Sequence, residues 1–405
     1  MEKEIPEGWV ETELSSILKL KNGFAFKSNK YKEEGIPVIR ISDIQDGNII
    51  LDKAVCVDEF DKENDFIVEN GDILIAMSGA TTGKFGIYNG HNKAYQNQRV
   101  GNLKPLNTQT SKKFIYYLIG NLRKEIEDKA YGGAQPNISA KLIEEIKINL
   151  PPLPAQERIV AKLDSIFAHL EMAKQGLEKI PVLLKEFRQA VLTQAVTGKL
   201  TEGKDWKLKT IESITTKVGS GSTPSGGQTA YQTSGIPLVR SMNIHFGGIK
   251  NEGLAFLNDK QAYELRNVTI EKNDVLLNIT GASIGRVCLA EDHIIGGRVN
   301  QHVSIVRANH IIVSPQFLNI AMSSPIVQNY INDENYGVTR QALTKGQLLN
   351  LEILLPPIEE QNEIVRRVDA LFSKADAIEA QYKKLKVQIN QLPQAILAKA
   401  FRGEV

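Results

Sequence analysis

Two stretches of the chain place apolar residues at alternating steps of four and three positions for more than four heptads. In the first stretch these residues are Ile159, Leu163, Ile166, Leu170, Ala173, Leu177, Ile180, Leu184, Phe187 and Val191. In the second they are Ile364, Val368, Leu371, Ala375, Ile378, Tyr382, Leu385, Ile389, Leu392 and Ile396. This spacing is the a and d pattern of a coiled coil. It predicts two long helices that pair along the seam; the alternative is two amphipathic helices within a globular core.

Proline and glycine residues mark the expected ends of both helices. Pro151-Pro152 and Pro356-Pro357 precede them, and Gly198 and Gly403 follow them. Proline favours an extended lead-in, and glycine is the usual residue just past a helix end. Pro181 lies inside the first helix and predicts a kink or a split there.

The direction of the pairing follows from the order of the segments along the chain. Each seam is about 50 Å long at roughly 1.5 Å per residue. The segment between the helices begins at the end of the first helix and finishes at the start of the second. Parallel helices would require that segment to bridge the whole length, whereas the ends of a domain usually lie close together. We therefore expect an antiparallel coiled coil within a dumbbell that has a pseudo-two-fold axis.

The helices belong to a repeat that covers most of the chain. Leu150-Pro151-Pro152-Leu153 recurs as Leu355-Pro356-Pro357-Ile358, an offset of 205 residues (355 − 150). Further matches at the same offset pair Gln156 with Gln361, Asp164 with Asp369 and Phe167 with Phe372. Upstream, looser matches pair Gly35–Arg40 with Gly235–Arg240, Asp72–Leu74 with Asp274–Leu276, and Asn97-Gln98 with Asn300-Gln301. The repeat predicts two domains, 1–149 and 201–354, each followed by a helix, 150–200 and 355–405.

Both predicted domains mix strand-like and helix-like segments. Apolar runs of strand length include Ile36–Ile41, Asp72–Ala76, Pro237–Arg240 and Val275–Ile279, and helical stretches include Ser111–Lys129 and Ser314–Ile331. This combination indicates an α/β (α+β) fold in both copies.

Composition narrows the class of protein. Hydrophobic residues make up 42% and charged residues 24% of the 405 residues, which is typical of a globular protein. No apolar run is long enough to span a membrane, and the N-terminus has no secretory pattern. Cys56 and Cys288 lack the spacing of a disulfide scaffold or a zinc site, so we expect a cytoplasmic setting. The net charge of +2 is low for a protein that binds nucleic acid by electrostatics alone.

Glycine- and serine-rich segments interrupt the strands, and basic residues lie in or near them. Examples are Ser78–Lys84 and Thr280–Arg286, which suit a close backbone approach to phosphates or are simple tight turns. Arg40 and Arg240 end equivalent strands, and Arg99 and Arg298 lie near the Asn-Gln pairs. Arg, Asn and Gln read base edges, although for each of these residues a structural hydrogen-bonding role is the alternative.

Motifs of catalysis are missing from the sequence. Ser78–Phe85 lacks the spacing of a phosphate loop, and Asn149–Leu153 lacks the aromatic residue of the amino-methyltransferase motif. The six histidines show no metal-ligand spacing, and nothing groups Ser, His and Asp into a triad. The sequence therefore predicts a non-catalytic chain. The alternatives are a self-contained methyltransferase or nuclease with fused recognition domains, and a coiled-coil adaptor that does not bind DNA.

Several of these pieces together resemble the specificity subunits of Type I restriction-modification enzymes. The resemblance rests on the repeated Leu-Pro-Pro motifs with their heptads, on Phe187–Leu192 and Gly198–Glu202, and on the ending Ala395–Glu404. Asn22–Ser28 is similar to the opening loop of a target recognition domain, which adds Lys27 to the candidate DNA-binding residues. These candidates are Lys27, Arg40, Lys84, Arg99, Arg240, Arg286 and Arg298.

The resemblance implies that each target recognition domain reads one half of a bipartite site in double-stranded DNA. The coiled coil would set the spacing of the half-sites and dock two modification subunits, and two restriction subunits would complete the complex. The chain would be needed for both adenine methylation and restriction. It would hold no cofactor, because S-adenosylmethionine, ATP and Mg²⁺ are expected in the partner subunits.

Overall fold

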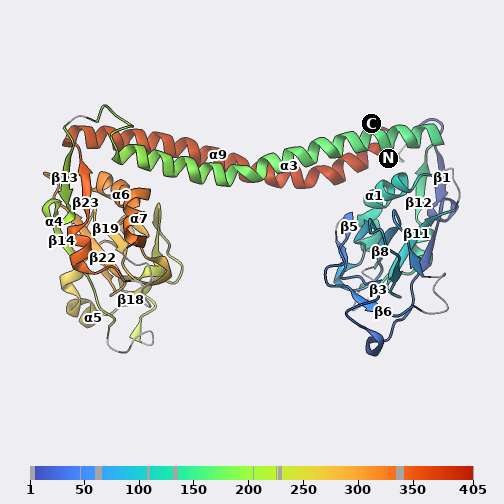
Figure 1. Cartoon of the computed structure of the whole chain (residues 1–405), viewed down its shortest axis with the longest axis horizontal. Helices are drawn as coiled ribbons and strands as arrows, with labels where there is room; N and C mark the ends of the chain where they lie inside the picture. Colours follow the sequence, from blue (N-terminus) through green and yellow to red (C-terminus); the bar gives the residue numbers. More distant parts are fainter. Residues whose placement is uncertain are drawn as a thin grey trace. The chain divides into compact units, whose positions relative to one another are not determined.

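The computed structural model describes residues 5–45, 47–59, 66–106, 110–130, 136–203, 205–224, 226, 230–333 and 342–404. The chain divides into two compact units (Figure 1). Unit 1 contains Met1–Leu177 and Lys384–Val405, and unit 2 contains Glu178–Lys383. Each unit holds one mixed α/β domain and one segment of each long helix, so the predicted fold class in two copies is confirmed.

Unit 1 is built around a mixed sheet of short strands, of which β8 (Ile73–Ala76) is fully buried. In their order across the sheet the strands are β2 (Leu18–Asn22), β11 (Val100–Pro105), β8, β9 (Phe85–Ile87), β5 (Gly47–Ile49) and β4 (Ile44–Gln45). A second sheet has the order β6 (Val55–Val57), β3 (Ile36–Ile39), β10 (Ala94–Gln96) and β7 (Ile67–Val68). The strand β1 (Val10–Glu13) pairs antiparallel with β12 (Lys147–Leu150) and so joins the two ends of the domain.

Helix α1 (Lys112–Ala130) supplies much of the core of unit 1. Its buried face, which includes Phe114, Leu118 and Ile126, packs with Leu18, Leu103 and Ile75 from the sheet. The apolar spacing that predicted a helix over 111–129 is this face. The short helix α2 (Ala140–Glu144) begins at a Ser139 cap, whose hydroxyl accepts a hydrogen bond from Leu142 N.

Unit 2 repeats this plan. Its main sheet has the order β14 (Thr215–Ser220), β22 (Val303–Ala308), β19 (Val275–Asn278) and β20 (Val287–Leu289). Other strands are β18 (Ala255–Leu257), β15 (Ile236–Val239) and β21 (Arg298–Val299) in one sheet, the hairpin β16 (Ile244–His245) and β17 (Gly248–Ile249), and the pair β13 (Lys207–Thr210) and β23 (Glu352–Leu355). Its short helices are α4 (Ile211–Ile214), α5 (Asp259–Glu264) and α8 (Lys345–Asn350).

The stretch 314–331 forms two helices in unit 2, where the sequence pattern predicted one. Helix α6 (Pro315–Ser323) ends at Ser324, which has an extended backbone, and α7 (Pro325–Asp333) begins at the next residue. Proline has no N–H to continue a helix and disfavours helical geometry in the residue before it. Pro325 therefore breaks the helix at a point where α1 of unit 1 continues.

The two long helices are α3 (Leu153–Val196) and α9 (Ile358–Ala400). Helix α3 continues through Pro181, so the predicted split at this residue is wrong; α9 likewise continues through Pro393. Proline removes one backbone hydrogen bond from a helix. The missing bond is the one to the carbonyl of Leu177, and the loss of this single bond does not end the helix.

In unit 1 the start of α3 packs with the end of α9. Ile159 and Leu163 lie in the same core cluster as Leu397, Ala400 and Phe401, and the Phe401 ring lies 5.5 Å from the ring of Phe114. Further along α3, Leu177 lines a hollow together with Leu385 and Ile389 of α9. Contacts that advance along α3 therefore move back along α9, and the helices are antiparallel in this unit.

In unit 2 the end of α3 packs with the start of α9. Val191, Ala195, Ile364 and Val368 share one core cluster. Nearer the middle of each helix, one Nη of Arg188 lies 2.6 Å from Asp376 Oδ1 and 3.1 Å from Glu379 Oε2. The predicted antiparallel pairing is thus confirmed within each unit.

The predicted seam residues differ in exposure. Ile159, Leu163, Leu170, Ile364 and Val368 are buried, and Ile166, Leu177 and Leu371 are half-buried. Ile378 is 49% exposed and Leu385 39% exposed. The seam side chains are therefore buried where a domain also covers them and more exposed to solvent towards the middle of the helices.

A repeated glutamine explains why the Leu-Pro-Pro motif matches so closely in the two copies. The Gln156 side chain is buried and donates from Nε2 to the carbonyl of Pro151 at 3.0 Å. The Gln361 side chain does the same to Pro356 at 2.9 Å, and its Oε1 accepts from Ser314 N at 2.7 Å. Each glutamine thus satisfies a buried carbonyl of the extended lead-in and fixes the start of the helix that follows.

Truncation of the buried seam should destabilise the unit to which the residue belongs. Leu163 and Ile364 are both fully buried, one in each unit. Leu163→Ala or Ile364→Ala removes core contacts and leaves a cavity, so each should lower stability by about 2–5 kcal/mol. Thermal unfolding followed by circular dichroism measures the effect. The exposed neighbours Lys162→Ala and Asn362→Ala are matched controls and should leave the transition in place; equal effects of both sets would contradict the seam.

Candidate nucleic-acid interface

Three loops of unit 1 leave the main sheet at the same end. Strand register places Val100 opposite Ala76 and Gly101 opposite Asn22, so β2 and β8 end where β11 begins. The loops are 23–27, 77–84 and 97–99, and we call them the loop edge of unit 1. Backbone hydrogen bonds join them: Phe24 N donates to Gln96 O, and Met77 N donates to Arg99 O, each at 3.0 Å.

Unit 2 has the same arrangement. Asn278 lies opposite Val303 and Ser220 lies opposite Ser304, so β14 and β19 end where β22 begins. The loop edge of unit 2 therefore consists of residues 221–224, 279–286 and 300–302. Gly221 N donates to Asn300 O at 3.1 Å, and Ile279 N donates to His302 O at 3.0 Å.

One glycine in each unit permits the close approach of the first of these loops. A Cβ atom on Gly23 would lie 2.2 Å from Asn97 O, and one on Gly221 would lie 1.8 Å from Val299 O. No side chain fits at such distances. The glycine therefore fixes the first loop against the 97–99 or 300–302 loop in both copies.

The predicted DNA-binding residues of unit 1 fall into two groups. Lys27 and Arg99 are exposed on the loop edge, Lys84 is half-buried there, and the side chains of these three have no hydrogen-bond or ion-pair partner among the described residues. Arg40 is engaged instead: its Nη2 donates to Lys53 O at 3.2 Å, and its Nε lies 3.7 Å from Asp43 Oδ2.

Arg240 of unit 2 repeats the contacts of Arg40. The Nη2 of Arg240 donates to Gly253 O. Gly253 follows Arg240 by 13 residues, and Lys53 follows Arg40 by the same 13 residues. The guanidinium carbon also lies 5.3 Å from the centre of the Tyr231 ring. The two arginines that end β3 and β15 therefore close the loop that follows each strand. This is a structural role for both arginines. Their contact with DNA stays a prediction.

The other two predicted arginines of unit 2 lie in different surroundings. Arg286 borders a shallow hollow of about 450 Å³ on the loop edge. Arg298 lies within hydrogen-bond distance of three backbone carbonyls, with its Nε 2.9 Å from Ala262 O and one Nη 3.0 Å from Gly297 O. Burial lowers the pKa of the Arg298 guanidinium. Its nitrogens hold loops of the protein together, and its contact with DNA also stays a prediction.

One further residue of this loop edge, His302, could have been predicted from the repeat. Asn97-Gln98-Arg99 aligns with Asn300-Gln301-His302, so His302 and not Arg298 is the counterpart of Arg99. The strand register agrees with this alignment. Arg298 lies opposite Leu238 in unit 2, and Tyr95 lies opposite Val38 in unit 1, so Arg298 is the counterpart of Tyr95. His302 borders the same hollow as Arg286, and the imidazole Nδ1 lies 2.5 Å from Thr280 Oγ1.

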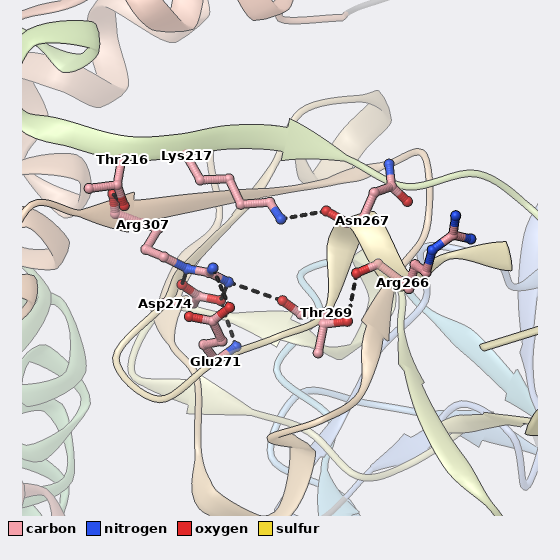
Figure 2. Close-up of polar contacts among 8 residues, drawn as sticks. All are labelled: Thr216, Lys217, Arg266, Asn267, Thr269, Glu271, Asp274 and Arg307. Atoms are coloured by element: carbon pink, nitrogen blue, oxygen red, sulfur yellow. Dashed lines mark hydrogen bonds and ion pairs between the residues drawn. The ribbon is translucent and has the colours of Figure 1, made fainter. Parts of the chain in front are cut away.

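The far end of each main sheet is tied by a buried aspartate. In unit 2, Asp274 accepts from Arg307 Nε at 2.7 Å, from Arg307 Nη2 at 2.9 Å and from Glu271 N at 2.7 Å (Figure 2). The same Nη2 of Arg307 donates to Thr269 O at 3.0 Å, and Glu271 pairs with Arg307 from the solvent side. These hydrogen bonds and the ion pair raise the pKa of Arg307 against the effect of burial.

Asp72 has the corresponding place in unit 1. It accepts from Glu69 N at 2.9 Å, Asn102 Nδ2 at 3.1 Å, Lys104 Nζ at 2.5 Å and Lys112 Nζ at 3.1 Å. Burial raises the pKa of Asp72, but the hydrogen bonds from Glu69 and Lys104 outweigh it and hold the pKa below its usual value. Both sheets are therefore rigidly tied at the end opposite the loop edge.

Among the described residues, no group of three or more His, Cys, Asp and Glu side chains is placed to hold a metal ion. In the same part of the chain, no helix is long and apolar enough to cross a membrane.

Residues 6–182 and 203–387 each match the Type I restriction modification DNA specificity domain. The chain belongs to this family. The EcoBI specificity subunit of a Type I restriction enzyme, from Escherichia coli, is 32% identical over 422 aligned positions, which cover 99% of this chain and 87% of that protein. The corresponding EcoKI subunit of Escherichia coli strain K12 is 29% identical and covers 99% of this chain and 90% of that protein.

Solved structures of specificity subunits share the fold. The HsdS subunit from Thermoanaerobacter tengcongensis superimposes with a TM-score of 0.67 at 18% identity, over 99% of this chain and 98% of that one. A chain from a structure on the assembly and conformational transition of a Type I restriction-modification system gives 0.69 at 19% identity, over 99% and 100%. The resemblance to Type I specificity subunits that the sequence motifs indicated is confirmed.

The Asp72 carboxylate should make the stability of this specificity subunit depend on pH. Its pKa is lowered in the folded chain, so its contribution is complete above the unfolded value of 3.8 and is lost as the pH falls through the folded value. Asp72→Asn should therefore destabilise the chain by about 3 kcal/mol near neutral pH and by less below pH 3.8.

Urea unfolding at a series of pH values measures this difference. Asp58→Asn is the matched control, because Asp58 pairs with Lys32 at the surface and is 74% exposed. Its removal should change stability by no more than about 1 kcal/mol at any pH. A destabilisation by Asp72→Asn that stays constant into the acid range would contradict the assignment.

Proposed function

We propose that the chain is the DNA-recognition subunit of a Type I restriction-modification complex, in which each domain reads one half of a bipartite target. The proposal rests on one observation: both units have the same main sheet with a buried aspartate at one end, but they carry different side chains on their loop edges. The buried aspartate is Asp72 in unit 1 and Asp274 in unit 2, whereas the position of Arg99 in unit 1 is occupied by His302 in unit 2. A protein that reads two different half-sites needs a common support and divergent contact residues.

In this proposal residues 1–149 and 201–354 are the target recognition domains, and 150–200 and 355–405 are the helices that join them. Lys27, Lys84 and Arg99 supply the basic contacts of the first loop edge, and Arg286 supplies one of the second. Their support is their position on the loop edges and the lack of other partners among the described residues. Basic side chains of this kind neutralise phosphates and read guanine.

The long helices would set the distance between the half-sites. A seam of about 50 Å corresponds to between one and one and a half turns of B-DNA, at roughly 34–36 Å per turn. The helices would also dock two modification subunits, and two restriction subunits would complete the complex. Exposed apolar side chains on both helices support a docking role: Met172 is 60%, Leu183 58% and Val387 58% exposed. Apolar side chains of this size at a surface are typical of protein interfaces.

The chain itself would be non-catalytic and would hold no cofactor. The modification subunits would supply S-adenosylmethionine and methylate adenine, and the restriction subunits would supply ATP- and Mg²⁺-dependent cleavage. The low net charge of +2 fits a subunit that shares its phosphate contacts with partners around the duplex.

A genome-wide map of methylated adenines tests the proposal. The full chain, produced with the modification subunits of its own system, should direct methylation to one motif with two separated halves. Exchange of residues 201–354 for the same domain of a relative should change one half and leave the other half and the spacing intact. A contiguous motif, or no motif, would refute the bipartite assignment.

The same preparation tests the two alternatives. Binding of S-adenosylmethionine or metal-dependent cleavage by the isolated chain would favour a self-contained enzyme. Failure of the assembled complex to bind duplex DNA would favour a coiled-coil adaptor. DNA binding that weakens steeply as the salt concentration rises is the expected result.

A further inference from the structure

Four polar side chains form a continuous hydrogen-bond chain across the loop edge of unit 2. Thr223 Oγ1 donates to Gln301 Oε1 at 2.6 Å, and Gln301 Nε2 lies 3.0 Å from His302 Nε2. His302 Nδ1 in turn lies 2.5 Å from Thr280 Oγ1. Because these residues come from 221–224, 279–286 and 300–302, the chain ties all three loops together through their side chains.

Hydrogen bonds anchor the amide of Gln301 at both of its polar atoms. With Gln301 Nε2 beside His302 Nε2, the amide nitrogen donates, and the ring proton lies on Nδ1 and is donated to Thr280; the reversed amide pairs with the other tautomer and makes the same contacts. The amide oxygen faces the Thr223 hydroxyl. The Gln301 amide is therefore held in place on both sides before any DNA is bound.

The fixed amide keeps unused hydrogen-bonding capacity. An amide oxygen has two lone pairs and an amide nitrogen has two N–H groups. The contacts with Thr223 and His302 use one of each, and Gln301 is exposed, so one acceptor and one donor remain for a partner in solution. Adenine presents the matching pair in the major groove, the N6 amino group as donor and N7 as acceptor, and Gln reads it with two hydrogen bonds.

We propose that Gln301 is the residue with which unit 2 recognises an adenine in its half-site, and that Thr223, His302 and Thr280 are positioning residues that hold its amide ready. The inference rests on the proposed function, because it assigns a base contact to the second recognition domain. A preformed contact loses less side-chain entropy on binding than a free glutamine does.

A buried amide behind the loop edge, that of Asn278, supports the assignment of this edge as a preformed site. Asn278 is fully buried and donates from Nδ2 to Ser241 O at 2.8 Å and to Ser283 Oγ at 3.1 Å. Ser241 and Ser283 border the hollow next to His302. The floor of the hollow is thus held by side-chain hydrogen bonds from below, while the Gln301 chain lies at its rim.

Unit 1 lacks this device at the equivalent positions. Gln98 is the counterpart of Gln301, but Arg99 replaces His302, and Ala25 stands three residues after β2 as Thr223 stands three residues after β14. Among the described residues the Gln98 side chain has no hydrogen-bond partner. The matching adenine preference therefore belongs to the second domain, whereas the first domain presents Arg99, whose guanidinium has no partner among the described residues.

Selection from a duplex library with randomised positions tests the assignment. The full chain, assembled with the modification subunits of its own system, is compared with Gln301→Ala, Gln301→Glu and His302→Ala. Gln98→Ala is the matched control in the other domain. His310→Ala is a second control, because His310 is exposed beyond the far end of β22.

Gln301→Ala should lose an adenine preference of about 5- to 150-fold at one position of one half-site and leave the other half unchanged. Gln301→Glu should move that preference towards cytosine, whose amino group donates to a carboxylate. His302→Ala should weaken the adenine preference less than Gln301→Ala does. Gln98→Ala should leave this half-site intact, and His310→Ala should change neither half.

Three results would overturn the assignment. The first is a wild-type bipartite motif that Gln301→Ala leaves unaltered, which refutes this inference and leaves the proposed function standing. The second is an equal loss of affinity for every sequence, which indicates a backbone contact. The third is a change in both half-sites with a lower melting temperature, which indicates a purely structural role. A wild-type complex that selects no bipartite motif refutes the proposed function itself.

Discussion

The antiparallel packing of α3 and α9 is the constraint on which the rest of the molecule depends. Leu397, Ala400 and Phe401 lie at the end of the chain, yet they complete the core that α1, β11 and the start of α3 begin. Unit 1 is therefore built from both ends of the chain, whereas unit 2 is one continuous segment. Without the return of α9, the apolar faces of Phe114 and Ile159 would lose a large part of their cover.

Within each unit, the main sheet has one tied end and one open edge. Each main sheet is tied at one end by a buried aspartate, Asp72 or Asp274, with a basic side chain from the neighbouring strand. Buried charge pairs break at a high free-energy cost, so this end resists rearrangement. The opposite end has loops with glycine at the points of close approach, and there substitutions change contacts without disturbing the core.

The sequence predicted the parts of the fold that depend on periodicity. The heptads of the two helices, the strand at Ile73–Ala76 and the helix at Lys112–Ala130 were visible because each buries one regular face. The break before Pro325 had a local signal too, since proline disfavours helix in the residue before it.

The interface was less predictable for a physical reason. A guanidinium has five donors and a long flexible stem, and the sequence does not say which carbonyl groups the fold will bring within its reach. Arg40 and Arg240 close their own loops, and Arg298 holds two others, although all three have the residue type expected of base readers. His302 could be predicted from the repeat, but only because it aligns with Arg99.

The two copies differ in the hydrogen-bond partners of their loop-edge hydroxyl groups. In unit 2, Thr280 bonds to His302 and Ser283 bonds to Asn278. Their counterparts in unit 1, Ser78 and Thr81, have buried hydroxyl oxygens without a hydrogen-bond partner among the described residues, because Arg99 and Ala76 occupy the other positions.

A buried hydroxyl without a partner costs about 1–3 kcal/mol, and a ligand or water that supplies one recovers that free energy. Under the proposed function, unit 2 would be ordered before it meets DNA, whereas unit 1 would gain hydrogen-bond partners on contact. Duplication followed by divergence would, under the same proposal, give one frame two modes of recognition, one preformed and one completed by its ligand.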